Sequence, residues 1–246
     1  MADLSQPRPT AGTTSWKRIL IPLIPCVVFC LGMLPTVFLA YLFFYFFSWS
    51  TIWHYLVIPI ALYLGMVILF LSELFISAGC IKLFKLTYAP GVYTYTLRDK
   101  NAFHWVVVCV LYTPMRMLLE MFPMGRIKNI YLRLLGMKIG KNTLVGGVIK
   151  DPCLTEFGDN TTMGEYAIIY GHIHNTEHGT ITMNKVKVGS CCVIGAGAIV
   201  MPGAVIQDNV TVAAGAVVTQ NQVLESGKMY GGVPAKEICK KEPTNT

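Results

Sequence analysis

Charged residues are scarce in this sequence, and their absence from two long segments decides its class. Asp, Glu, Lys and Arg make up 13% of the 246 residues, against about 25% in an average soluble domain. Residues 19–47 carry no charge, and residues 51–81 contain His54 and Glu73 as their only acidic or basic side chains. About 20 apolar residues cross a bilayer core as a helix. The sequence therefore predicts an integral membrane protein with two transmembrane helices, in preference to two buried core helices.

The first apolar segment is not a cleavable secretory signal, because it is too long and no small-residue cleavage site follows it. Basic residues flank the two segments, whereas the turn "SWST" between them has no charge. The flanking residues are Arg8, Lys17, Arg18, Lys82, Lys85, Arg98, Lys100, Arg116, Arg126 and Lys128. Cytoplasmic flanks of transmembrane helices collect Lys and Arg. We therefore expect a tail over 1–18, a transmembrane hairpin over 19–84, and both termini in the cytoplasm.

Nucleic-acid binding and a disulfide framework are both disfavoured. The net charge is +7, but the basic residues flank apolar spans and line no aromatic-rich groove, so the charge fits a membrane surface better. The eight cysteines include no CxxC pair. Cytoplasmic cysteines stay reduced, and we expect these to act as small hydrophobic residues.

A basic and aromatic segment over 85–136 joins the apolar spans to the rest of the chain. Apolar clusters alternate there with charged residues, and Pro114 and Pro123 are predicted to break the segment into short helices. Helices of this composition commonly lie in the membrane interface. We interpret the segment as an interfacial amphipathic connector; the alternative is ordinary packing against the following domain.

From residue 139 the sequence repeats with a period of six. Eleven of the twelve residues that share the repeat position are apolar: Ile139, Val145, Asp151, Phe157, Met163, Ile169, Val188, Ile194, Val200, Ile206, Val212 and Val218. A fixed six-residue period is typical of a β-helix and does not fit the 3.6-residue period of an α-helix. Three hexads make one coil, so residues 139–174 and 188–223 each predict two coils.

The stretch "GHIHNTEHG" over 171–179 holds three of the five histidines. The interval from Ile169 to Val188 exceeds an 18-residue coil by one residue, so residues 175–187 are expected to leave the β-helix. His172 and His174 then lie where this extension departs. A catalytic base, a metal site and a merely solvated loop all remain open at this point.

Five stretches carry a family resemblance: "LGMKIGKN", "FGDNTTMGEYAII", "VGSCCVIGAGAIVMPGAVI", "VAAGAVVT" and "GGVPAKEIC". They resemble the hexapeptide-repeat acyltransferases, in particular the branch of maltose, galactoside and colanic-acid O-acetyltransferases. The resemblance implies a left-handed parallel β-helix over 137–240 and a homotrimer. The expected fold class is therefore mixed, with this C-terminal β-helix following two N-terminal transmembrane helices.

The resemblance also implies acyl transfer from acetyl-CoA or another acyl-CoA, in a cleft between two subunits. A histidine beside an extended loop takes the proton of an acceptor hydroxyl or amine. His172 matches that position best and His174 is the second candidate. Glu177 is expected to orient one of the two rings, as a third group often does.

Donor binding is implied on the later coils and in the closing motif. The matching residues are Gly195, Ala196, Ala213, Ala214, Gly232, Pro234 and Lys236. Small residues are also needed at β-helix corners regardless of ligand. The family usually has Lys or Arg directly after "VVT", where this chain has Gln220. Lys236 and Lys240 remain as phosphate partners, and an acyl carrier remains an alternative donor.

Two other functions compete with acyl transfer. The γ-class carbonic anhydrases share the β-helix, but their zinc needs histidines that converge across a subunit interface. Here three histidines are local and none occurs over 179–246, so no metal is expected. A non-catalytic trimeric scaffold is the other alternative. For the enzyme, the membrane anchor suggests a lipid-linked sugar or a lipid head group as acceptor.

Two carboxylates sit at unusual positions. Asp151 is the only charged residue at an inward repeat position, where an unpaired carboxylate is costly. Either the coil bulges at Pro152 so that Asp151 points outward, which we favour, or Asp151 serves the acceptor site. Glu73 either reaches the interface from near the cytoplasmic end of its span, which we favour, or faces a partner helix.

Overall fold

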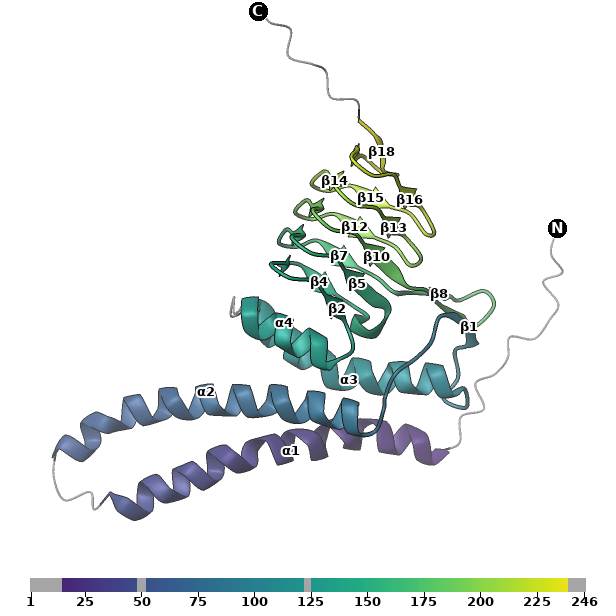
Figure 1. Ribbon diagram of the computed structural model, residues 1–246. Coiled ribbons are helices and arrows are strands. Elements are labelled where there is room, and N and C mark those ends of the chain that lie inside the picture. Colours follow the sequence, from purple (N-terminus) through teal and green to yellow (C-terminus); the bar gives the residue numbers. More distant parts are fainter. Residues whose placement is uncertain (1–14, 48–51, 122–124, 239–246) are drawn as a thin grey trace, which may run out of the picture. The chain divides into compact units, whose positions relative to one another are not determined.

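The computed structural model describes residues 15–47, 52–121 and 125–238 (Figure 1). These residues form two compact units: one of residues 87–105 and 125–238, and one of residues 15–47, 52–86 and 106–121. Most of the predicted tail over 1–18, the "SWST" turn, Pro123 and Lys240 lie outside the described residues.

The two long apolar segments are long helices, as predicted. Helix α1 covers Ser15–Phe46 and α2 covers Ile52–Leu83, and the two helices contact each other. Three helices of the described chain are long and apolar enough to cross a membrane: α1, α2 and also α3, Lys100–Met121. The sequence predicted only the first two.

Helix α3 corrects the prediction that Pro114 breaks the connector. The helix runs through Pro114, which removes one backbone donor without ending the helix. Beyond the proline, Arg116 Nη1 lies 2.8 Å from Glu120 Oε1, an i,i+4 ion pair that supports the helical conformation. Pieces separated by breaks were therefore the wrong interpretation for 100–121, although a second helix, α4, follows over Gly125–Leu134.

Glu73 faces the partner helix, and the expectation that it reaches the interface was wrong. Its side chain is buried against Gly32 of α1, where any Cβ would overlap the carboxyl group. The neighbouring Ser72 hydroxyl donates a hydrogen bond to the Gly32 carbonyl oxygen. Because Gly32 has no side chain, Ser72 and Glu73 of α2 can pack against α1 at this point.

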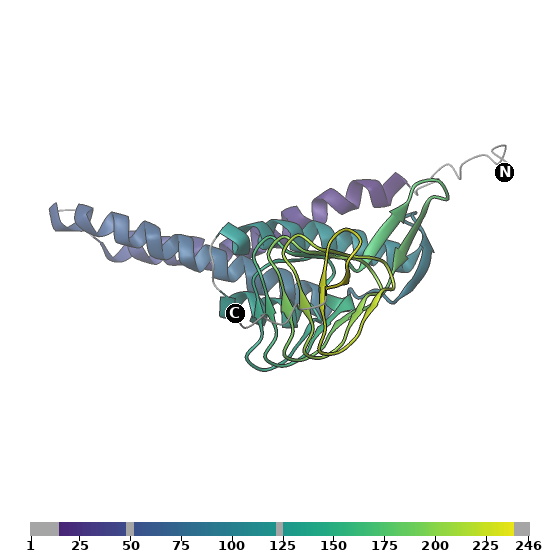
Figure 2. The same ribbon diagram turned by 90° about the horizontal axis from the view of Figure 1, so that it is seen from above.

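The repeat region forms a β-helix with three parallel faces, and its coils are seen stacked in Figure 2. The first face consists of β2 (Lys138–Ile139), β5 (Thr155–Phe157), β10 (Val186–Val188), β13 (Val205–Ile206) and β16 (Val223–Leu224). The second consists of β3 (Leu144–Val145), β6 (Thr162–Met163), β11 (Val193–Ile194), β14 (Thr211–Val212) and β17 (Met229–Gly231), with β18 (Lys236–Glu237) added antiparallel. The third consists of β4 (Val148–Ile149), β7 (Ile168–Ile169), β12 (Ile199–Val200) and β15 (Val217–Val218).

The core confirms eleven of the twelve predicted stacking positions. Each strand points one apolar residue inward, onto its equivalent in the next coil, as Met163 pairs with Ile194 and Ile169 with Val200. The exception is Asp151, because Ile149 occupies that position and pairs with Ile169. The chain then forms a short 3₁₀ helix over Pro152–Leu154 before it rejoins the first face. The predicted bulge is therefore present, but Asp151 is fully buried rather than outward.

Asparagine turns the corner between the first and second faces. In four coils the corner residue has a φ of 53° to 59°, a left-handed conformation that Asn adopts more readily than most residues. These residues are Asn142, Asn160, Cys191 and Asn209. Helix α4 contacts β2 and β3 of the first coil. Its Lys128, predicted as a membrane-flanking cation, is instead buried and donates to the carbonyl oxygens of Gly146 and Gly147 at 3.1 and 2.7 Å.

The predicted extension is a β-hairpin. Strands β8 (His172–Asn175) and β9 (Thr180–Met183) pair antiparallel, and β1 (Gly91–Thr94) from the connector adds to β9. The hairpin explains the long interval in the repeat: Phe157 pairs with Val188, whereas Val188 pairs with Ile206 in the usual 18-residue register. Residues 87–105 and 125–136 of the connector therefore belong to the β-helical unit, whereas residues 106–121 belong to the unit of the two long helices.

Candidate active site

The first residue of the hairpin, His172, meets Asp151 of the preceding coil. His172 Nδ1 lies 2.7 Å from Asp151 Oδ2, and the Gly171 backbone N–H donates to the same oxygen at 2.8 Å. Both segments are departures from the repeat: the 3₁₀ turn carries Asp151 and the hairpin carries His172. Because both depart where the third face leads into the first, they bring a carboxylate and an imidazole together.

Two connector residues complete the surroundings of Asp151. The Tyr88 hydroxyl donates to Asp151 Oδ1 at 2.9 Å, and Trp105 Nε1 donates to the same oxygen at 3.2 Å. All four contacts of the carboxylate are therefore with donors or with a ring nitrogen that can donate, which is what an anionic acceptor requires. The buried position of Asp151 is compatible with its charge because of these partners.

Trp105 is held in place by the cap of α3. Asp99 Oδ1 accepts the backbone N–H groups of Asn101 and Ala102 at 2.8 and 3.1 Å, which satisfies donors of the first helical turn. The Asn101 side chain in turn accepts the Ala89 N–H at 3.2 Å. These bonds fix the start of the helix against the segment that leads into β1, and so fix the indole of Trp105.

The hydrogen bonds assign the tautomer of His172. If Nδ1 carries the proton and donates it to Asp151, Nε2 keeps a lone pair and can accept a proton. Trp105 Nε1 also lies 3.3 Å from His172 Nδ1. Two N–H donors cannot bond to each other, so the indole proton belongs to Asp151 Oδ1. The arrangement is that of a general base oriented by a carboxylate.

His174 lies beside this pair among aromatic rings. Its ring centroid is 4.7 Å from that of Tyr95, 5.1 Å from that of Trp105 and 5.4 Å from that of His172. Partial burial lowers the pKa of His174, and the charge of His172 lowers it further, while Asp151 opposes both effects. His174 is therefore held neutral at physiological pH, where it can donate and accept hydrogen bonds but carries no charge.

The lowered pKa of His174 predicts a pH-dependent stability. The unfolded chain binds a proton at this residue near pH 6.5, but the folded chain does so only at lower pH. Folding stability contributed by His174 is therefore complete above pH 6.5 and is lost as the pH falls below that value. We expect Tm to fall less between pH 7.5 and pH 5.5 in His174→Gln than in the wild type. Equal falls in the two proteins would contradict this assignment.

Glu177 is not the orienting carboxylate. It is exposed in the turn of the hairpin, three residues beyond His174, and a strand advances about 3.3 Å per residue. Asp151 instead provides the carboxylate that contacts His172. His178 in the same turn is also exposed, and its backbone N–H donates to Asn175 Oδ1 at 3.1 Å.

A thiol lies close to the pair but is unsuited to nucleophilic chemistry. Burial raises the pKa of Cys153 to about 11, and the nearby charge of Asp151 raises it as well, against opposing hydrogen bonds from Tyr88. A thiol with so high a pKa is almost entirely protonated near neutral pH. Among the described residues, no three His, Cys, Asp or Glu side chains come together as a metal-binding group.

The predicted donor-binding residues share one corner of the β-helix. Gly195 and Ala196 follow β11, and Ala213 and Ala214 follow β14 one coil later, where the second face leads into the third. The corners are closely stacked: the Gly215 N–H donates to the Ala196 carbonyl at 2.9 Å. Gly232 lies on the next coil, where its carbonyl accepts the Val217 N–H at 3.0 Å, and Pro234 and Lys236 follow as exposed residues. Strands β12 and β15 separate this corner from the corner of the histidine hairpin.

Sequence reasoning missed Tyr88, Tyr95 and Trp105, and it placed Asp151 wrongly. The charge of Asp151 at an inward position was the one available signal, since a buried carboxylate needs partners. The three aromatic residues gave no comparable signal, because they lie in the connector and the hydrogen bond from Trp105 to Asp151 spans 46 residues.

Comparison with known proteins identifies the family. The model of the family "Bacterial transferase hexapeptide (six repeats)" matches residues 185–220. A Bacillus subtilis (strain 168) protein named "Putative acetyltransferase YvoF" is 34% identical over 128 residues, which cover 49% of this chain and 70% of that protein. The chain belongs to the hexapeptide-repeat transferase family.

Other proteins are similar to parts of the chain. Gamma carbonic anhydrases 2 and 1 of Arabidopsis thaliana, both mitochondrial, are 33% and 35% identical over 102 and 86 residues. The chain spans only 30% and 26% of the length of these two proteins, while the matches cover 42% and 35% of the chain. Among solved structures, a maltose O-acetyltransferase from Clostridium difficile 630 is 21% identical, covers 62% of this chain and 94% of its own, and has a TM-score of 0.46.

Proposed function

We propose that this hexapeptide-repeat transferase moves an acyl group, such as acetyl, from CoA or an acyl carrier to a hydroxyl or amine of a membrane-proximal acceptor. The observation that supports this most is the contact between His172 and Asp151 at the base of the hairpin. A carboxylate that accepts the Nδ1 proton leaves Nε2 as the basic atom, and the other contacts of Asp151 hold the carboxylate in place.

The proposed reaction is a direct transfer. The acceptor oxygen or nitrogen forms a bond to the thioester carbonyl carbon while its proton passes to Nε2 of His172. Asp151 stabilises the imidazolium that results. The carbon–sulfur bond then breaks, and the imidazolium returns the proton to the leaving thiolate. The products are the acylated acceptor and free thiol, and no external oxidant or reductant is needed.

A homotrimer supports this chemistry, because in one chain the histidines and the small-residue corner lie at different corners. The first face points charged residues outward, including Lys138, Glu156 and Lys187. The third face instead points a row of half-buried apolar side chains outward: Val148, Ile168, Ile199 and Val217. We propose that this third face packs on a neighbouring copy. The hairpin of one subunit then lies beside a corner of the next, where the donor binds.

The membrane anchor consists, in this proposal, of α1 and α2 alone. Trp105, near the start of α3, is bonded to Asp151, and Asn129, shortly after the end of α3, is bonded to the carbonyl of Thr143. Both partners belong to the same β-helical unit. A helix that crossed the membrane between these two points would leave them on opposite sides. We therefore place α3 at the interface. The basic residues that flank the two spans are the reason for proposing a cytoplasmic β-helix.

The position of Trp105 supports an acceptor at the membrane surface. Trp105 touches both His172 and His174, and the apolar part of α3 begins with the next residue. The proposed acceptor is therefore one at the membrane surface, such as a lipid-linked sugar or a lipid head group. Equal turnover of soluble and lipid-linked sugars would remove this reason for an anchor.

Native mass spectrometry of the full-length protein in detergent, with and without acetyl-CoA, tests the proposal. We expect a trimer that takes up as many as three CoA molecules. Binding of neither CoA nor metal by a trimer would support a scaffold or a carrier-protein donor. A trimer that carries zinc and ignores acetyl-CoA would contradict the proposal in favour of carbonic anhydrase chemistry, the second candidate, which the identity to the two plant proteins favours.

A further inference from the structure

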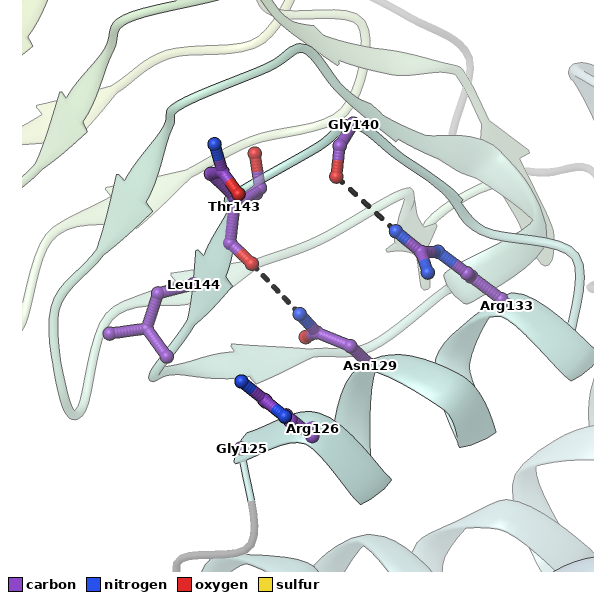
Figure 3. Close-up of a pocket in the computed structure, with 8 residues that line it drawn as sticks. Gly125, Arg126, Asn129, Arg133, Gly140, Thr143 and Leu144 are labelled. Atoms are coloured by element: carbon purple, nitrogen blue, oxygen red, sulfur yellow. Dashed lines mark hydrogen bonds between the residues drawn. The ribbon is translucent and has the colours of Figure 1, made fainter.

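A polar cavity lies away from the histidine hairpin, between α4 and the first corner of the β-helix (Figure 3). Its volume is about 520 Å³, and it is lined by Gly125, Arg126, Asn129, Arg133, Gly140, Asn142, Thr143 and Leu144. Both charged residues in this lining are arginines. None of the lining residues takes part in the proposed acyl-transfer step, so the cavity is a candidate for a separate binding site.

The helix α4 presents its polar residues to the cavity as a single row. Arg126, Asn129 and Arg133 are spaced by three and four residues, which places them on one face of the helix. Figure 3 shows the three side chains along the same side of α4, facing the segment that contains Gly140 and Thr143. Because α4 begins at Gly125, the positive end of its dipole adds to the charge of Arg126, whereas Arg133 lies in the last turn of the helix.

Two hydrogen bonds hold this row in position without using all of its donors. Arg133 Nη2 donates to the carbonyl oxygens of Ile139 and Gly140 at 2.9 and 3.2 Å, and an arginine has further N–H donors on its other nitrogens. Arg126 and Arg133 are both exposed residues that line the cavity. The nearby Asp159 carboxylate lies against Gly140 and accepts the Lys141 backbone N–H at 2.6 Å.

Asn129 adds a different requirement. Its Nδ2 donates to the Thr143 carbonyl at 2.8 Å, which fixes the orientation of the amide. Its Oδ1 is then buried and has no hydrogen-bond partner among the described residues. A buried acceptor normally has a donor, from the protein or from a bound molecule. The cavity thus combines cationic donors for an anion with an acceptor that needs a hydroxyl.

We propose that this cavity binds a phosphate ester of a polyol, with the phosphate at Arg126 and Arg133 and a hydroxyl donating to Asn129 Oδ1. Guanidinium groups match the geometry of phosphate oxygens, and the exposed side chain of Leu144 offers an apolar wall for the carbon skeleton. The ester can come from a phospholipid head group such as phosphatidylglycerol or from a soluble compound such as glycerol 1-phosphate. The proposal does not depend on acyl transfer.

Binding by the full-length protein in a nonionic detergent tests the site. The probes are glycerol 1-phosphate, dihexanoyl-phosphatidylglycerol and inorganic phosphate, and the readout is Kd from isothermal titration calorimetry. We expect Arg126→Gln to weaken binding of glycerol 1-phosphate about ten-fold, because a charge-assisted hydrogen bond is lost. Asn129→Ala is expected to weaken glycerol 1-phosphate and to leave inorganic phosphate unchanged.

Arg98→Gln is the matched control, since Arg98 is an exposed arginine of the same unit outside the cavity. Much tighter binding of dihexanoyl-phosphatidylglycerol than of glycerol 1-phosphate would support the site and identify a lipid as its source. Equal binding of the two esters would support the site and identify a soluble ester. An unchanged Kd in Arg126→Gln, or inorganic phosphate bound as tightly as either ester, would overturn the proposal.

Discussion

Replacement of His172 by glutamine is expected to lower kcat for acyl transfer by roughly 10²–10⁴-fold, the usual contribution of a general base. Glutamine retains a polar group of similar reach but cannot accept a proton at neutral pH. The Asp151 carboxylate keeps its bonds from Tyr88, Trp105 and Gly171, so we expect the variant to fold. The measurement is the release of free CoA thiol from acetyl-CoA in the presence of a lipid-linked acceptor.

The matched control is His178→Gln, the same change at an exposed histidine in the turn of the same hairpin. Its kcat should stay close to that of the wild type. His174→Gln belongs beside these two variants, because His174 was the second candidate for the base. If His174→Gln loses kcat and His172→Gln retains it, the roles of the two residues are reversed. Retention of kcat by both variants would show that neither histidine is the general base.

The repeat was predictable because it depends on a local rule that every coil obeys. One apolar residue per strand faces the core, and the spacing of six appears directly in the sequence. Counting six residues on from Val145 gives Asp151 as the inward residue of the third strand. The residue that occupies this position is Ile149, two residues earlier. The chain stacks Ile149 on Ile169 and then inserts a 3₁₀ turn, so the coil keeps its length although its third strand begins early.

The candidate site was only half predictable, because its two halves obey different rules. His172 could be found from the break in the repeat. Its partners could not, since Tyr88 and Trp105 reach Asp151 from a segment that has no repeat of its own. Contacts of this kind depend on how the connector folds back through β1 and the capped start of α3. The sequence of the connector and the sequence of the repeat contain no pattern that predicts this contact between them.

Asp151→Asn is expected to lower kcat by roughly 10³–10⁴-fold, because the amide removes the negative charge that stabilises the His172 imidazolium. The substitution is also expected to destabilise the fold, because of the hydrogen bonds that Asp151 accepts. The Asp151 oxygens receive N–H groups from Gly171 and Trp105 on opposite sides, so the new amide NH₂ must face one of these donors. An unsatisfied buried donor costs about 1–3 kcal/mol, and Tm should fall accordingly.

The control for this variant is Asp208→Asn, which makes the same chemical change at an exposed corner. Asp208 Oδ1 accepts the Ser190 N–H at 2.7 Å, and the amide oxygen of asparagine can preserve that bond. Steady-state kinetics separate a positioning role from a general loss of structure. Asp151 is fully buried and contacts His172, so it is not expected to touch the donor, and KM for acetyl-CoA should change little while kcat falls. If Asp151→Asn raises KM and leaves kcat intact, Asp151 serves binding, and His172 must act without it.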